Sequence, residues 1–137
     1  AVRNVQGLHA MKHLIDTHTL LWYLSANKQL SRIAYDAIEN DQNSIYISQA
    51  TLFELAIKVS LGKLILPCEW EDLFFKINTM GWTILTMGNT DFVTLSSLPF
   101  HHADPFDRLI ACQAINLKIP VISIDSKLDK YGVSRVW

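Results

Sequence analysis

Four acidic residues of this sequence stand where a carboxylate could do chemistry. Asp16 directly follows the apolar residues 14–15, and Asp125 directly follows the apolar run 121–124. Both runs have the length and composition of buried strands. An Asp at the end of a strand either caps the helix that follows or holds a ligand beyond the carboxyl end of the strand. Taken singly, Asp16 and Asp125 leave both interpretations open.

Glu54 lies inside a predicted helix, on an apolar arc rather than opposite to it. One face of this helix carries the apolar residues Ala50, Phe53, Ile57 and Leu61. At about 100° per residue, Glu54 falls roughly 40° from Ala50, whereas an acid that only confers solubility would lie on the polar face. The alternative is an ion pair with Lys58, four residues on, which contributes about 0.3–0.5 kcal/mol. Glu54 is therefore a candidate for chemistry.

Asp107 repeats this pattern at the edge of the apolar face of a predicted helix over 104–117, about 20° from Ala114. Arg108 points to the other side, as a solvated charge would, although its guanidinium could reach a substrate phosphate. Asp104 is the better helix cap, because Pro105 would then occupy the first helical position, where its missing N–H costs nothing. We therefore assign Asp104 mainly to capping and Asp107 mainly to chemistry, with Asp104 close enough to contribute.

Together the four acids predict a cation site, provided that they meet at one end of a sheet. Two carboxylates about 4 Å apart repel each other by roughly 4 kcal/mol at an effective dielectric constant of about 20. Several such terms are large against a net folding stability of about 5–15 kcal/mol, so the cluster must bind protons or a cation. Ligand sets made of oxygen select hard ions such as Mg²⁺ or Mn²⁺. A cation that keeps water on its open positions suits attack of water on a phosphodiester.

Strands and helices that alternate along the chain are expected to position these acids. Apolar runs of strand length cover residues 13–15, 45–47, 83–85 and 121–124. Helical patterns cover residues 17–24, 31–39, 48–61, 69–80, 91–98, 104–117 and 125–131. The alternation predicts βαβ units, and hence one three-layer α/β/α sandwich around a mostly parallel sheet. Ligands bind beyond the carboxyl ends of the strands in such sheets.

The composition agrees with one compact domain and excludes several functional classes. Half of the 137 residues are hydrophobic and 18% are charged, which permits a core and argues against disorder. No apolar run reaches the roughly 18 residues that a membrane span needs. The formal net charge of −1 excludes a generally basic surface for nucleic acid, although a local patch could still bind it.

The cysteines and the first ten residues bear on the compartment and on the limits of the domain. Cys68 and Cys112 lie in apolar surroundings without the spacing of metal ligands, and we interpret both as reduced core residues of a cytoplasmic protein. Residues 1–10 lack an initiator Met and the apolar segment of a signal peptide. We interpret them as a leader or a cloning remnant. The native start is then Met11, and residues 11–137 form a single domain.

Three other classes of protein share parts of this pattern. Metal hydrolases that begin with Asp-Thr-His-x-His are similar to residues 16–19, but Leu20 stands where their second His would be. Phosphatases with an Asp nucleophile carry a second Asp two residues on, where this chain has His18. His101 and His102 are adjacent and point in different directions, so we interpret them as part of a turn rather than a metal pair. A non-catalytic binding protein that uses its carboxylates as helix caps is the remaining alternative.

The four acidic stretches are LIDTHTLLW at 14–22, SQATLFELAIK at 48–58, HADPFDRLIA at 102–111 and SID at 123–125. In this order and at these spacings they resemble the motifs of PIN-domain ribonucleases, and most of all the small VapC-type toxins of bacterial type II toxin–antitoxin systems. The match spans nearly everything from residue 11 to residue 137. One stretch alone is a weak signal, but four in the family's order make a strong match.

This resemblance implies an activity, a fold and partners. The activity is that of a Mg²⁺- or Mn²⁺-dependent endoribonuclease; tRNA is a frequent target in the family, but no residue here specifies it. The implied sheet is parallel, with strand order 3-2-1-4-5. The implied partners are a second copy in a homodimer and a cognate antitoxin whose C-terminal segment blocks the active site. A PIN-like nuclease outside toxin–antitoxin systems and a non-catalytic PIN-like binding module are the alternatives.

The resemblance also implies roles for individual residues. Asp16 and Asp107 are the expected core metal ligands. Glu54 binds metal or positions water, and Asp125 completes the acidic ring. Two hydroxyls at strand ends could orient a carboxylate or a phosphate, with helix capping as the alternative: Thr17 and Ser123.

Overall fold

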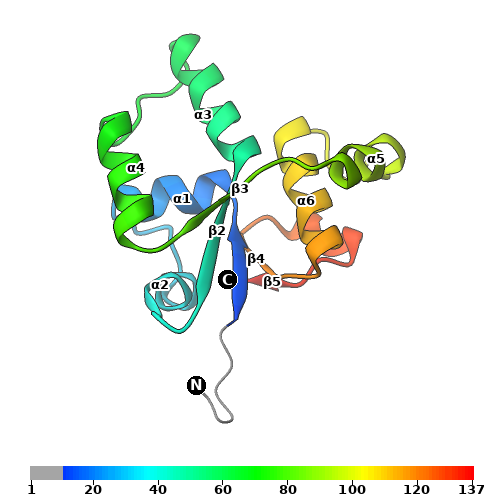
Figure 1. Cartoon of the computed structure of the whole chain (residues 1–137), viewed down its shortest axis with the longest axis horizontal. Coiled ribbons are helices and arrows are strands. Elements are labelled where there is room, and N and C mark those ends of the chain that lie inside the picture. Colours follow the sequence, from blue (N-terminus) through cyan, green and yellow to red (C-terminus); the bar gives the residue numbers. More distant parts are fainter. Residues whose placement is uncertain (1–10) are drawn as a thin grey trace.

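The computed structural model describes residues 11–137, which form a five-stranded sheet with helices on both sides (Figure 1). The strands are β1 (Lys12–Ile15), β2 (Ser44–Ser48), β3 (Thr83–Leu85), β4 (Val121–Ile122) and β5 (Arg135–Val136). They are parallel, in the order β3-β2-β1-β4-β5. The predicted three-layer class and the strand order 3-2-1-4-5 are therefore confirmed. The interpretation of residues 1–10 lies outside the described residues.

The central strand β1 aligns the residues that carry the chemistry. Ile15 pairs with Ile47 of β2 on one side and with Ile122 of β4 on the other. Leu14 and Ile15 are fully buried, because helices cover both faces of the sheet. Parallel pairing places the carboxyl ends of β1 and β4 at the same edge. Asp16 and Asp125 follow these two ends, as the sequence predicts.

The helices begin and end close to the predicted limits. They are α1 (Thr17–Leu24), α2 (Arg32–Glu39), α3 (Gln49–Ser60), α4 (Trp70–Thr79), α5 (Asn89–Ser97) and α6 (Pro105–Leu117), followed by the 3₁₀ helix η1 (Ser126–Tyr131). The Ser31 hydroxyl caps α2 by accepting a hydrogen bond from the Ala34 N–H at 3.0 Å. Gly132 ends η1 with φ at 75°, a left-handed conformation that glycine adopts without strain.

Each face of the sheet has its own apolar core. On one face Ile38 of α2 and Leu73 of α4 pack with residues of β1 and β2. On the other face Ile110 of α6 packs with Val121 of β4 and with Leu128 of η1. Figure 1 shows the same division, with α2 and α4 on one side of the strands and α5 and α6 on the other. Within residues 11–137 no helix combines the length and the hydropathy needed to cross a membrane.

The apolar face of α3 does not pack as the sequence predicts. Ala50 is buried, but Phe53 is 57% exposed, and Ile57 and Leu61 are exposed as well. The buried side of α3 is instead the one that carries Thr51, Glu54 and Leu55. Figure 1 shows the reason: the C-terminal part of α3 projects beyond the sheet, so its apolar face has no layer to pack against. Glu54 is buried as expected, but it does not share a buried face with Phe53.

The last strand is the element that the pattern did not reveal. β5 has only two residues, Arg135 and Val136, which is too short for a recognisable apolar run. β4 is also shorter than the predicted 121–124 and ends at Ile122, directly before Ser123, whose hydroxyl donates to the Asp16 carboxylate. Both cysteines are free, with Cys112 buried and Cys68 half-buried.

Candidate active site

The predicted acids gather at the carboxyl edge of the sheet from four different segments. Asp16 lies between β1 and α1, and Asp125 lies at the start of η1. Asp107 stands in the first turn of α6, and Glu54 stands in the middle of α3. Hydrogen bonds through Ser123 connect Asp16 with Asp125, and His102 is hydrogen-bonded to Asp125 and lies at ion-pair distance from Asp107. The fourth acid, Glu54, accepts a hydrogen bond from the hydroxyl of Thr17, next to Asp16. The sheet topology therefore brings all four into one region.

Asp16 uses one oxygen to cap its helix and the other to bind a neighbouring strand end. Its Oδ1 accepts a hydrogen bond from the Thr19 N–H at 3.0 Å, and its Oδ2 accepts one from the Ser123 hydroxyl at 2.5 Å. The residue is only 4% exposed. Each carboxylate oxygen has a second lone pair, so capping leaves Asp16 able to hold a ligand. The two interpretations from the sequence are compatible.

Ser123 joins the ends of β1 and β4. Its hydroxyl donates to Asp16 and accepts a hydrogen bond from the Asp125 N–H at 3.0 Å. A single buried hydroxyl thus fixes the positions of two acids that are more than a hundred residues apart. Ser123 therefore orients a carboxylate, as one of the two predictions for it states. Its hydrogen bond with the N–H two residues on is also the kind of contact that a capping residue makes.

Glu54 is held by a hydroxyl and a cation. Its Oε1 accepts a hydrogen bond from the Thr17 hydroxyl at 2.7 Å, and its Oε2 lies 2.6 Å from the Lys58 Nζ. The ion pair that was the alternative for Glu54 therefore exists. Its hydrogen bond raises the pKa of Lys58, although burial opposes the shift. A buried carboxylate that already has a cation is less available to a metal than its neighbours are.

Asp107 is the acid whose charge is least compensated. Burial and the negative charges of Asp104, Asp16 and Glu54 together raise its pKa from 3.8 to about 7, although His102 lowers it. At neutral pH the Asp107 carboxyl is therefore balanced between binding a proton and binding a cation. This electrostatic coupling also shows that Asp16, Glu54 and Asp104 lie close enough to act on one point.

Asp125 is fixed at both oxygens. Its Oδ1 accepts a hydrogen bond from the Lys127 N–H at 3.0 Å, and its Oδ2 lies 2.6 Å from the His102 Nε2. Burial on its own would raise the pKa of Asp125, but the Lys127 N–H and the His102 imidazole lower it. Asp125 is thus the ionised neighbour of Asp107.

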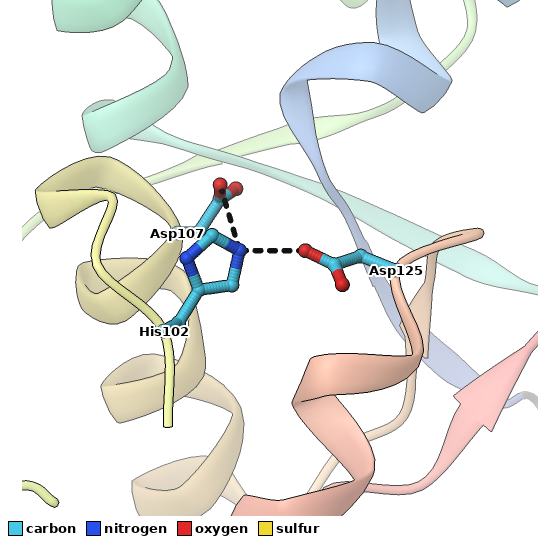
Figure 2. Close-up of side chains that lie close together, drawn as sticks. All are labelled: His102, Asp107 and Asp125. Carbon is cyan, nitrogen blue, oxygen red and sulfur yellow. Dashed lines mark hydrogen bonds and ion pairs between the residues drawn. The ribbon is translucent and has the colours of Figure 1, made fainter. Parts of the chain in front are cut away.

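His102 is the residue at this site that sequence reasoning missed. The backbone bends at residues 100–101, just before His102, and His101 does point elsewhere, with its ring 5.0 Å from that of Tyr131. The interpretation of His102 as an ordinary turn residue is wrong: its ring is buried and lies between Asp107 and Asp125 (Figure 2). The available signal was its place two residues before the Asp104–Pro105 cap.

Arg108 corrects a second expectation. Its side chain is not solvated but 6% exposed, and its guanidinium donates hydrogen bonds to the carbonyl oxygens of Leu98 and Pro99 at 3.1 and 2.9 Å. It also covers the ring of Phe100 at 3.9 Å. These contacts occupy both terminal nitrogens of the guanidinium, so we expect it to hold this segment rather than to meet a phosphate. Arg108 fastens the segment that leads to His102.

Asp104 caps α6 as predicted. Its Oδ1 accepts hydrogen bonds from the N–H groups of Phe106 and Asp107 at 2.8 and 3.3 Å, and Pro105 occupies the first helical position. Whether Asp104 also contacts a metal stays a prediction.

The donor set fits a hard divalent cation. Asp107, Asp125 and His102 each offer an atom within 4.8 Å of the others, and the raised pKa of Asp107 marks an excess of negative charge. The carboxylate oxygens of Asp107 and Asp125 suit Mg²⁺ or Mn²⁺, whereas the His102 nitrogen is not a ligand that these hard ions prefer.

A comparison with protein families gives a match over most of the chain. A family model described as the PIN domain matches residues 13–133. A search of curated proteins found no match.

Solved structures show the same fold. VapBC2 from Rickettsia felis, bound to a DNA fragment from its promoter, aligns with a TM-score of 0.64 and 18% identity over 91% of this chain and 97% of that chain. VapBC-1 from nontypeable Haemophilus influenzae aligns with a TM-score of 0.63 and 18% identity over 91% and 96%. PAE2754 from Pyrobaculum aerophilum has a TM-score of 0.51 and 17% identity over 98% and 92%.

Proposed function

Because this chain belongs to the PIN-domain family, we propose that it is a metal-dependent endoribonuclease that serves as the toxin of a toxin–antitoxin pair. The observation that carries the proposal is the state of Asp107, whose pKa rises to about 7 in burial among three other acids. A site built only for capping has no need of this repulsion. A cation bound among these acids would relieve it.

Mg²⁺ or Mn²⁺ would be held by Asp16, Asp107 and Asp125. When bound, such an ion supplies a water of lowered pKa and stabilises the charge that develops on a phosphate. The protein's own groups prepare the site: Ser123 fixes Asp16, and His102 contacts the other two acids.

Glu54 and its partners would act beside the metal. Glu54 is held by Thr17 and Lys58, so its position is set before any substrate arrives. The Lys58 side chain is 39% exposed, and its charge could attract a phosphate from solvent. We assign Glu54 to the orientation of water or of Lys58 rather than to direct metal binding.

The proposal of a toxin includes two protein partners, a cognate antitoxin and a second copy of the chain. The sequence resembles VapC-type toxins, and two of the solved structures with this fold are VapBC pairs. Large apolar side chains are exposed along α3 and α4, at Phe53, Ile57, Leu61, Phe74 and Phe75. Apolar surface of this kind marks a protein interaction site. A toxin that cuts cellular RNA would act in the cytoplasm.

One observation favours a second candidate, a non-catalytic binding module. Asp16, Asp104 and Asp125 all accept backbone N–H groups, as simple caps do. Asp107 distinguishes the two functions, because burial and neighbouring acids raise its pKa, a cost that a cap does not require.

The test is to sequence RNA ends after induced expression in cells, with an Asp16→Asn variant as the control. We expect new RNA ends at a restricted set of sites with the wild type and none with the variant. The same sites would identify the RNA target. Identical RNA ends and equal growth inhibition for both proteins would exclude the nuclease function.

A further inference from the structure

The hydrogen bonds of His102 define which of its ring nitrogens carries the proton. The Asp104 N–H, a group that can only donate, points at the His102 Nδ1 at 3.1 Å. Nδ1 must therefore be unprotonated in this arrangement. A neutral imidazole then carries its proton on Nε2.

The protonated Nε2 faces two carboxylates at once. It lies 2.6 Å from Asp125 Oδ2 and 3.3 Å from Asp107 Oδ2. Figure 2 shows the ring between the two side chains, one from α6 and one from the start of η1. The Nε2–H thus donates its hydrogen bond to Asp125, and the same nitrogen lies at ion-pair distance from Asp107, so the ring contacts both elements that bring these acids to the sheet edge.

The fold, rather than a ligand, holds the ring in place. The backbone N–H of His102 donates to the Tyr131 hydroxyl at 3.0 Å, and that hydroxyl donates to the Pro99 carbonyl at 2.7 Å. Arg108 binds the carbonyls of Pro99 and Leu98 from the other side. The segment before α6 is therefore anchored to η1 and to α6, and His102 is only 8% exposed.

Direct metal binding by this ring would conflict with those contacts. A metal needs the lone pair of Nε2, so the proton would have to move to Nδ1. Nδ1 could then no longer accept from the Asp104 N–H, and the backbone at the start of α6 would lose a partner.

We propose that His102 is a positioning residue: its Nε2–H sets the spacing between Asp107 and Asp125 and does not bind the metal. The effect of His102 on metal binding and RNA cleavage rests on the proposed function, whereas the position of its ring proton can be measured without any activity. Partners that orient a metal's ligands are worth about 10–100-fold in metal affinity or activity.

Two substitutions separate the two nitrogens of the ring. In His102→Gln the side-chain amide can place an N–H near the position of Nε2. In His102→Asn the shorter side chain can only replace the acceptor at Nδ1. We expect His102→Asn to weaken Mg²⁺ binding, measured by calorimetry, and Mn²⁺-dependent RNA cleavage by about 10–100-fold. We expect His102→Gln to stay within a few-fold of the wild type.

The control is His101→Asn, which changes the adjacent, exposed histidine and should leave both quantities unchanged. Melting temperatures of all variants show whether each one folds. Equal losses of Mg²⁺ affinity in folded His102→Gln and His102→Asn would overturn the proposal.

A spectroscopic test decides between positioning and direct binding without using activity. Long-range ¹H–¹⁵N correlation spectra of histidine-labelled protein distinguish a protonated ring nitrogen from an unprotonated one. We expect the His102 proton on Nε2 both without and with saturating Mg²⁺. Transfer of the proton to Nδ1 on addition of Mg²⁺ would overturn the proposal. A wild type that binds Mg²⁺ but cuts no RNA would contradict the proposed function and leave this result intact.

Discussion

At the scale of single residues, the four acids differ in the donors that already stabilise their charge. Glu54 has Lys58, Asp16 has a hydroxyl and a helix N–H, and Asp125 has His102. Asp107 shares the same imidazole at the longer distance of 3.3 Å and is buried among the other charges. The missing counter-charge is therefore concentrated at Asp107. Substitution of Asp107 should therefore have the clearest effect on metal binding.

Replacing Asp107 with Asn should stabilise the protein without metal and abolish Mg²⁺ binding. The amide has the same shape but removes the repulsion from Asp104, Asp16 and Glu54. At pH 8 in EDTA we expect a rise of a few degrees in melting temperature, because each kcal/mol shifts a domain of this size by roughly 3–5 °C. A clear fall would indicate that Asp107 is mainly structural.

The raised pKa of Asp107 also predicts how stability depends on pH. An acid whose pKa is higher in the folded than in the unfolded protein contributes stability that is present below pH 4 and is lost as the pH rises through about 7. The melting temperature of the metal-free wild type should therefore fall between pH 5 and pH 8 relative to that of Asp107→Asn. Mg²⁺ should reduce the fall. Parallel curves for the two proteins without metal would argue against this shift.

At the scale of elements, short contacts between helices and strand ends build the site. Thr17 of α1 reaches Glu54 of α3, and the Thr19 hydroxyl donates to the carbonyl of Ile122 at 2.9 Å. α6 is tied through Arg108 to the segment before it. These contacts position elements that carry one of the acids, as α3 and α6 do, or that begin directly after one, as α1 does.

A Thr17→Val variant tests the link between α1 and α3. It keeps the shape of the side chain but leaves a buried oxygen of Glu54 without its donor. We expect the free energy of unfolding, from urea denaturation, to fall by about 1–3 kcal/mol, with a loss of RNA cleavage. Thr90→Val, at an exposed position of α5, is the matched control. An unfolding free energy equal to that of the control would show that this contact is not stabilising.

An Arg108→Lys variant tests whether Arg108 supports the segment 98–100 rather than the substrate. An ammonium cannot reproduce the fork that meets two carbonyls and covers Phe100. We expect a loss of stability of about 1–3 kcal/mol. A higher KM for RNA at unchanged melting temperature would instead indicate contact with phosphate.

The strands and helices also show which parts of the fold and of the site could be predicted from the sequence. Apolar runs that end in Asp predicted β1 and β4 and the edge where Asp16 and Asp125 lie, because strand length and burial are local properties. The roles of His102 and Arg108 were not predictable, since they depend on contacts with Asp125 and with Pro99 that only the folded chain creates. The apolar face of α3 misled for a related reason: periodicity shows that a face is apolar, but not what covers it.

At the scale of the whole molecule, the order of the strands and helices brings the four acids to one edge of the sheet. The parallel order β3-β2-β1-β4-β5 puts two acids at neighbouring strand ends and lets α3 and α6 add one each. The net charge of −1 provides no general attraction for nucleic acid, so the RNA recognition that we propose would depend on the proposed metal site and on local groups such as Lys58. The exposed apolar side chains of α3 and α4 form a surface suited to binding a protein partner.

The most direct test of the central claim is RNA cleavage by the purified protein as a function of Mn²⁺ concentration. We predict cleavage of a structured RNA that stops in EDTA, returns with Mn²⁺ and is lost in Asp107→Asn. Asp36→Asn, which removes an exposed acid paired with Arg32, should cut like the wild type. Cleavage that is absent at every Mn²⁺ concentration, or that persists in EDTA or in Asp107→Asn, would contradict the account.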